Sequence, residues 1–407
     1  MARLEIYDGR FCEYEYESAF ISFLEKEGWH YLPGKSINRA SQREVLYLDD
    51  LEHFLSSTNP DLLAEEIRQI MDKVRLAGAE SDFATLHKLY GWMVNGIQFT
   101  PQNGLSRMVQ LIDFENPDAN VFRVVNQFTV EYMDHGMVEN RRPDILLFVN
   151  GMPLCIIELK NPAVAHATIS DAWEQINVRY WRDIPHLLHY CPLACISDGV
   201  KTRLGTVRTP YEHFYAWRRV DEGDAVSTRP FEETKSMISG VYRPSRFLEI
   251  FRDYIYFQDS EYDSYEREIV CRYPQFFAAR LLKQSIIRSV IEKSGKGGTY
   301  FGATGCGKTY TMAFLARQLS LRCTNIPQIG SPTIILIVDR DELQKQGAKL
   351  FTKSKEFLSL GEVSIVRNRK QLREELGIRA SGGFYICTIQ KFCDREDDKI
   401  GLINNRR

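Results

Sequence analysis

Two acids and a lysine in the middle of the chain have the residue types and order needed to cut a phosphodiester bond. Pro143-Asp144 is followed by Ile157-Glu158-Leu159-Lys160, in the form PD…ExK. Such hydrolysis uses oxygen ligands for Mg²⁺, which polarises the phosphate and activates a water, and a nearby cation. Asp144 and Glu158 are the candidate metal ligands, and Lys160 is the candidate cation. A surface ion pair, or charges that guard a strand edge, fits these residues as well.

A second group of residues, 302–309, has the sequence GATGCGKT and matches the pattern G-x4-G-K-[ST]. Glycines let such a loop curl around a triphosphate, while Lys308 places a charge near the β- and γ-phosphates and the Thr309 hydroxyl can ligate Mg²⁺. Gln275, upstream of the loop, is a candidate adenine contact, although an isolated glutamine is more often a surface amide. The candidate ATP-binding residues are Gln275, Thr304, Gly305, Cys306, Gly307, Lys308 and Thr309.

The elements around the acids are predicted to be strands. Short β-branched and apolar runs separated by Asn, Asp, Pro and Gly fill residues 107–160 and predict a sheet. Asn150-Gly151 predicts a hairpin that folds the strand of Asp144 back beside that of Glu158. A two-residue turn alone would pair residue 144 with residue 157. We therefore expect a three-residue loop or a bulge around Gly151-Met152, which would bring Asp144 opposite Glu158.

Helices and strands alternate around the glycine-rich loop. The expected elements are a helix at 276–292, a strand at 298–301, a helix at 308–320, a strand at 333–338, a helix at 341–358 and a strand at 383–388. This alternation predicts a parallel α/β sheet. At 407 residues the chain is longer than one core usually serves, roughly 250–300 residues. We predict an α/β protein with two domains: a mixed sheet flanked by helices in 1–265, and a parallel α/β domain in 266–407.

Composition excludes some classes of protein. The chain is 44% hydrophobic and 26% charged, which is typical of a folded globular protein. Its net charge of −2 gives no global attraction to nucleic acid, so any such binding must come from local basic clusters. Nine scattered cysteines without a CxxC pair favour a reducing cytosol. No apolar run approaches the roughly 18 residues of a membrane helix, and we expect a cytoplasmic protein that is not in a membrane.

Taken together, the motifs resemble the R (HsdR-type) subunit of type I restriction–modification enzymes. The resemblance rests on FRVVNQFTVE, RRPDILLFVNGMPLCIIELKNP, the glycine-rich loop, VDRDELQKQ and TIQKF, in the family's order, and covers nearly the whole chain. It implies a PD-(D/E)xK endonuclease domain, then a RecA-like superfamily 2 motor domain that moves double-stranded DNA with ATP. Family members work in bacteria or archaea with methylase and specificity subunits, and use Mg²⁺ and ATP.

The resemblance also assigns residues. Asp144, Glu158 and Lys160 match the family's nuclease centre, and Gln175 and Tyr180 are candidates for a Gln and Tyr on the next helix. Five residues of α-helix rotate by roughly 500°, which leaves those two about 140° apart and favours a packing role for Tyr180. Glu17 resembles an N-terminal acid of the family, although a solvated glutamate on a helix face fits equally. The candidate DNA contacts are Arg340, Gln346, Thr388, Gln390 and Lys391.

Residues 266–407 contain no DEAD- or DEAH-type motif, so we expect this chain to bind ATP but to hydrolyse it poorly. Two other interpretations remain at this stage. A repair-type helicase–nuclease has similar parts and needs no methylase partner. A nucleotide-dependent DNA-binding module would keep the acids without binding a metal, and divalent-ion binding distinguishes it from a nuclease.

Overall fold

The computed structural model describes residues 13–78, 80–160, 168–226, 229, 232–258, 266–339, 350–352, 363–379 and 381–392. The chain divides into two compact units. The first contains the described residues of 1–255 and 267–272, and the second those of 256–266 and 273–407. Strand β12 (Arg267–Val270), just past the predicted boundary at 265, therefore belongs to the first unit.

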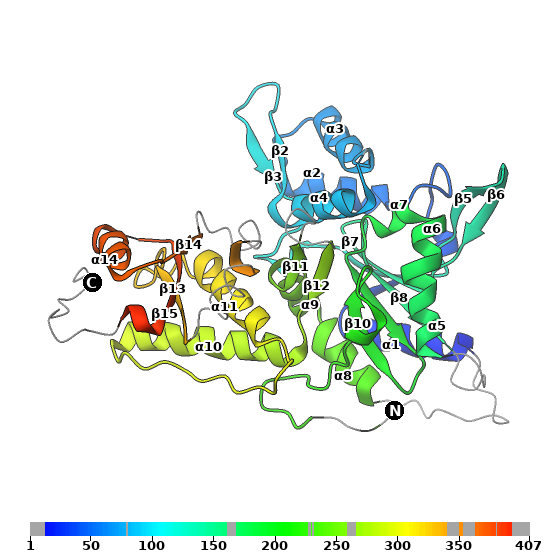
Figure 1. Ribbon diagram of the computed structural model, residues 1–407. Helices are drawn as coiled ribbons and strands as arrows, with labels where there is room; N and C mark the ends of the chain where they lie inside the picture. The colour runs from blue at the N-terminus through cyan, green and yellow to red at the C-terminus, as the bar shows by residue number, and fades with distance from the viewer. Residues whose placement is uncertain are drawn as a thin grey trace, which may run out of the picture. The chain divides into compact units, whose positions relative to one another are not determined.

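A mixed sheet of six strands, in the order β1-β4-β7-β8-β9-β10, forms the centre of the first unit (Figure 1). The strands are β1 (His30–Pro33), β4 (Phe122–Asn126), β7 (Ile145–Val149), β8 (Met152–Leu159), β9 (Leu193–Ser197) and β10 (Thr202–Thr206). The pairs β1–β4 and β8–β9 are parallel, and the other neighbours are antiparallel. Every residue of β7 and β8 is buried. This explains their nearly continuous apolar sequences, which are typical of strands covered on both faces.

Helices and two hairpins surround this sheet. The helices are α1 (Glu13–Lys26), α2 (Leu48–Thr58), α3 (Ala64–Arg75), α4 (Asp82–Asn95), α5 (Ile169–Glu174), α6 (Trp181–Asp183), α7 (Pro185–Leu188), α8 (Glu232–Val241) and α9 (Pro244–Asp253). Helix α1 packs against β1, β4 and β8, and α5 packs against β8 and β9. One hairpin pairs β2 (Ile97–Phe99) with β3 (Arg107–Val109), and the other pairs β5 (Val130–Asp134) with β6 (Met137–Arg141). The β5–β6 hairpin projects from the sheet (Figure 1). Strand β11 (Ile255–Gln258) follows α9.

The turn between β7 and β8 is a two-residue turn, and the expected three-residue loop is absent. Asn150 and Gly151 have φ of 49° and 76°, as a type I′ turn requires. A Cβ on Gly151 would lie 2.0 Å from the carbonyl oxygen of Tyr47, so only glycine fits. The expected bulge is present but lies farther along β8, where Leu147 pairs with Cys155 and Phe148 with Pro153. Leu154 is thus the extra residue, and beyond it the register places Asp144 opposite Glu158.

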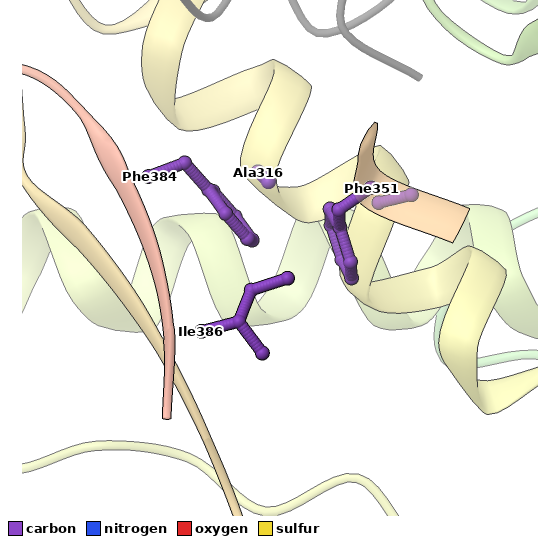
Figure 2. Close-up of a cluster of buried hydrophobic side chains, with 5 residues drawn as sticks. Ala316, Phe351, Phe384 and Ile386 are labelled. Carbon is purple, nitrogen blue, oxygen red and sulfur yellow. The ribbon is translucent and has the colours of Figure 1, made fainter. Parts of the chain in front are cut away.

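The second unit contains a parallel sheet in the order β13-β15-β14. Its elements are α10 (Tyr273–Glu292), α11 (Lys308–Arg322), β13 (Ile334–Val338), β14 (Val363–Ile365), α14 (Arg369–Ile378) and β15 (Phe384–Thr388). Phe351 stacks on Phe384 with ring centroids 4.5 Å apart, and both pack with Ala316 of α11 and Ile386 of β15 (Figure 2). This cluster anchors the helix that follows the glycine-rich loop to the sheet.

One predicted strand of the second unit does not form. Residues 298–301 have no regular secondary structure, and Phe301 is 93% exposed. The glycines at 297 and 298 weaken strand propensity, which accounts for the difference. The predicted helix at 341–358 lies outside the described residues except for 350–352. No helix in the described ranges has the length and apolar character needed to cross a membrane.

Candidate active site and nucleotide-binding loop

Glu158 lies at the end of β8 and is fully buried. One of its carboxylate oxygens, Oε1, accepts a hydrogen bond of 2.8 Å from the Tyr180 hydroxyl. The other, Oε2, accepts one of 2.7 Å from Nε2 of Gln175. The carboxylate is therefore fixed in one orientation by two side chains from the next helical segment.

Asp144 and Lys160 lie beside this carboxylate. Asp144 directly precedes β7, and its Oδ2 accepts a hydrogen bond of 2.8 Å from the backbone N–H of Leu159. Lys160 directly follows β8, and its Nζ donates to Oε1 of Gln175 at 2.7 Å. The three residues of the PD…ExK pattern, together with Gln175, thus form one connected group at the ends of two adjacent strands.

The expected separation of Gln175 and Tyr180 is wrong, because residues 175–180 form a π-helical turn and not an α-helix. Hydrogen bonds from i to i+5 widen the turn, so residues five apart lie on the same side. The Gln175 amide accordingly donates to the Tyr180 hydroxyl at 2.7 Å. Tyr180 is 1% exposed, and it contacts Glu158 directly as well as packing.

The electrostatics of the group favour a cation. Burial, followed by the negative charge of Asp144, raises the pKa of Glu158 well above its usual value, while the charge of Lys160 and the Tyr180 hydrogen bond lower it. Two adjacent carboxylates provide the oxygen ligands that Mg²⁺ prefers, and this ion commonly uses one or two carboxylates with waters and phosphate oxygens. Within the described residues no cluster of three or more His, Cys, Asp or Glu is suited to a metal, and Asp144 and Glu158 form a pair of acids.

Glu17 is buried in α1 rather than solvated, being 5% exposed. Its carboxylate accepts hydrogen bonds from Asn126 at 2.6 Å and from Gln127 at 2.7 Å. Gln127 has a φ of 50°, and its backbone N–H donates to the carbonyl oxygen of Asp144 at 3.1 Å. Glu17 therefore does not contact the acid cluster directly in these hydrogen bonds. It supports the cluster through Gln127, which bonds to both Glu17 and Asp144.

The glycine-rich loop has the backbone conformation expected from its sequence. Gly305 and Gly307 have φ of 79° and 83°, in the left-handed region that favours glycine. Lys308 begins α11, and its Nζ donates to the carbonyl oxygens of Gly302 and Ala303, each at 2.9 Å. The lysine thus curls over a loop that precedes a helix N-terminus, which is the arrangement that binds phosphate groups.

The other loop residues are accessible to a ligand. Thr304 and Gly305 are exposed, and Cys306 and Thr309 are partly exposed. Gln275 is not a surface amide, because it is buried and its Nε2 donates to the carbonyl oxygens of Cys306 at 3.3 Å and Gly307 at 3.2 Å. The structure therefore places Gln275 against the loop, although the two are about 30 residues apart in the sequence.

The candidate DNA contacts are only partly described. Arg340 and Gln346 lie outside the described residues. Thr388 is buried at the end of β15. Gln390 is exposed, and its side chain donates to the carbonyl oxygen of Asp339 at 2.7 Å. Lys391 donates to the carbonyl oxygen of Val366.

Sequence reasoning missed a group of arginines beside the acid cluster. A cleft of about 440 Å³ is lined by Gln175 and Tyr180 together with Arg141, Arg142 and Arg179. Two of these arginines directly precede Pro143-Asp144 in the sequence RRPD. The position of these two arginines directly before Pro143-Asp144 could have indicated that they lie near the acid cluster.

Comparisons with known proteins match both units. A family model described as "Type I restriction enzyme R protein N terminus" matches residues 10–213, and a model described as "SWI2/SNF2 ATPase" matches residues 274–407. The type I restriction enzyme HindI endonuclease subunit of Haemophilus influenzae is 30% identical over 97% of this chain and 38% of its own length. The type I restriction enzyme SauCOLORF180P endonuclease subunit of Staphylococcus aureus is 25% identical over 70% of this chain and 27% of its own.

The chain therefore belongs to the type I restriction enzyme R protein family, whose N-terminal model matches half of its residues. It spans 38% of the length of the Haemophilus relative.

Proposed function

We propose that this chain is a Mg²⁺-dependent endonuclease joined to an ATP-binding motor domain and acts on double-stranded DNA. Residues 1–265 would form the PD-(D/E)xK nuclease domain and residues 266–407 a RecA-like domain. In the complete assembly, methylase and specificity subunits would select unmodified DNA in the cytoplasm of a bacterial or archaeal cell. The observation that carries the proposal is the hydrogen-bonded group of Asp144, Glu158, Lys160 and Gln175 in a chain of this family.

The nuclease residues have distinct roles in this proposal. Asp144 and Glu158 would hold the metal ion, which when bound polarises the phosphate and lowers the pKa of a water. Each oxygen of Glu158 accepts one hydrogen bond from a side chain of the π-helical turn, and the carboxyl group also interacts with Asp144. The Lys160 ammonium, held by Gln175, can orient the attacking water or offset negative charge that develops on the phosphate.

The motor residues would bind ATP at the start of α11. Lys308 would move from the carbonyl oxygens of its own loop to the β- and γ-phosphates, and Thr309 would ligate Mg²⁺. Gln275 would contact the adenine with its side-chain amide, whose Nε2 also supports the loop. We propose that residues 266–407 by themselves hydrolyse ATP slowly, since they include no DEAD- or DEAH-type acidic motif.

A plasmid-nicking assay with Mg²⁺ tests the nuclease proposal. Lys160→Ala is expected to lower the nicking rate by about 100-fold or more, as removal of a charge-stabilising donor does in other active sites. Lys88→Ala is the matched control, because that lysine is in α4 and pairs with Glu80 at 3.0 Å. Equal rates for the parent and Lys160→Ala would overturn the role of Lys160.

Calorimetry tests the metal site independently of cleavage. Asp144→Ala is expected to remove the heat of Mg²⁺ binding at this site, because a single remaining carboxylate binds the ion weakly. A trace that matches the parent would reject the metal role of Asp144 and would favour a DNA-binding module without cleavage.

A further inference from the structure

The cleft beside the acid cluster is built for a polar ligand. Gln175 and Tyr180, which hold the two oxygens of Glu158, are also part of its wall. The other side chains that line it are polar or charged, and three of them are the arginines Arg141, Arg142 and Arg179. A ligand in the cleft would therefore be anionic, and it would touch the same two side chains that fix the proposed metal ligand.

Arg141 is committed to the protein and forms part of the wall. Its Nε donates to Asp183 at 2.7 Å, and the Asp183 side chain, only 5% exposed, also pairs with Arg182 at 2.7 Å. The guanidinium group also lies over the Tyr132 ring, 5.2 Å from its centroid. These contacts tie the end of β6 to α6 and so fix the position of the neighbouring residue, Arg142.

Arg142 and Arg179 are the cations that remain for a ligand. Arg142 is exposed, and within the described ranges it has no carboxylate at ion-pair distance. Arg179 pairs with Glu174 at 3.1 Å, but both side chains are about half exposed, at 52% and 49%. Such surface pairs contribute little, so Arg179 can exchange Glu174 for a stronger anion. Guanidinium groups match phosphate oxygens well because they donate two parallel hydrogen bonds.

We propose that Arg142 and Arg179 bind a phosphodiester group of the DNA. This group would neighbour the phosphodiester that is cut, on the same strand. This inference rests on the proposed nuclease function and adds a substrate-binding subsite to it. DNA fits the cleft better than a free anion does, because the cleft adjoins the acid cluster. Gln175 and Tyr180 contact Glu158 and also line the cleft, and a DNA strand carries a phosphate at every nucleotide. One strand can therefore occupy both places, whereas a single phosphate ion cannot.

The test measures binding of a short fluorescein-labelled DNA duplex by anisotropy, with Ca²⁺ in place of Mg²⁺ to prevent cleavage. Arg142→Ala is expected to weaken binding by about tenfold and to lower the slope of log affinity against log salt by about 1, because one phosphate contact is lost. Arg142→Lys keeps the charge and should recover part of the affinity. Arg179→Ala should behave like Arg142→Ala.

Arg68→Ala is the matched control, because Arg68 is an exposed arginine in α3. Arg142 is exposed too, so its replacement should not change the thermal unfolding curve. If Arg142→Ala binds as the parent does with the same salt slope, or if Arg68→Ala weakens binding equally, the subsite does not exist. Weaker binding by Arg142→Ala in a chain that never nicks plasmid would keep the subsite and reject the nuclease function. If the chain nicks plasmid normally and Arg142→Ala does not change DNA binding, the nuclease function is kept and the subsite is rejected.

Discussion

Glu158 depends on its neighbours for its charge. Its oxygens accept hydrogen bonds from Tyr180 and Gln175, but burial and the charge of Asp144 raise its pKa well above the usual value. The residues of the chain alone thus favour the protonated acid, and a bound cation favours the carboxylate. Any metal bound here should therefore release a proton on binding.

Glu268 is another buried acid of the first unit and is 3% exposed. It lies in β12, and the Thr206 hydroxyl donates to its backbone carbonyl at 3.2 Å. Burial raises the pKa of Glu268 well above its usual value, while the hydrogen bond with Thr206 and the charge of Arg208 lower it. The folded protein therefore favours the protonated acid, whereas the unfolded chain ionises near a pKa of about 4.3.

This difference makes stability depend on pH. Below the unfolded pKa, Glu268 is protonated in both states and costs nothing, and the cost appears as the pH rises toward the folded pKa. Glu268→Gln never ionises, so its stability relative to the parent is expected to rise as the pH rises from about 4 to about 8, by about 1.4 kcal/mol for each unit by which the folded pKa exceeds the unfolded one. Urea denaturation at several pH values measures it, with Glu65→Gln on the exposed face of α3 as control. A difference that does not change with pH would contradict the assignment.

At the scale of elements, the register of β7 and β8 was predictable in outcome but not in detail. The pattern required Asp144 opposite Glu158, and Asn150-Gly151 identified the turn. The bulge, however, lies at Leu154 and not beside the turn. A bulge anywhere between the turn and Glu158 gives the same register. Hydrophobic alternation cannot locate it, because both faces of β8 are buried.

The π-helical turn was not predictable from the sequence at all. The residues from Gln175 to Tyr180 have no glycine or proline to mark an irregularity, and α-helical geometry separates the two side chains. The tertiary contacts decide the geometry, since both side chains reach the fixed carboxylate of Glu158. Sequence reasoning therefore named residues that the structure brings together, but it gave them a wrong arrangement.

A π-helical turn is equivalent to an α-helix with one extra residue, which gives a direct test. Deleting the 48% exposed Val178 would place the tyrosine four residues after Gln175, and four α-helical residues leave side chains only roughly 40° apart. The deletion variant is expected to nick plasmid within about tenfold of the parent and to remain folded. Inserting alanine after Val178 would turn the tyrosine by roughly 100° and abolish nicking.

Thermal unfolding of both variants provides the control for folding. The idea is wrong if the deletion variant is folded yet nicks DNA as poorly as the insertion variant. In that case Tyr180 would require the wide turn itself, and not merely a position on the same side as Gln175.

At the scale of the whole molecule, each unit has a hydrophobic core of its own. In the second unit, β15 contributes Phe384 and Ile386 to one cluster and Tyr385 and Cys387 to another. Because alternate residues of a strand point to opposite faces, the parallel sheet is covered on both sides. The acid cluster depends on the six-stranded sheet of the first unit. The two sets of candidate residues therefore lie on separate scaffolds and share no residue.

Separate scaffolds predict that the two proposed activities of this chain can be removed one at a time. Lys308→Ala is expected to weaken binding of a fluorescent ATP analogue by about 10- to 100-fold, the cost of losing a charged hydrogen bond of about 1.5–3 kcal/mol. Its Mg²⁺-dependent nicking without nucleotide should stay close to that of the parent. Asp144→Ala should show the opposite pattern, with normal nucleotide binding and no nicking. If either folded variant loses both activities, the two sites are coupled within this chain.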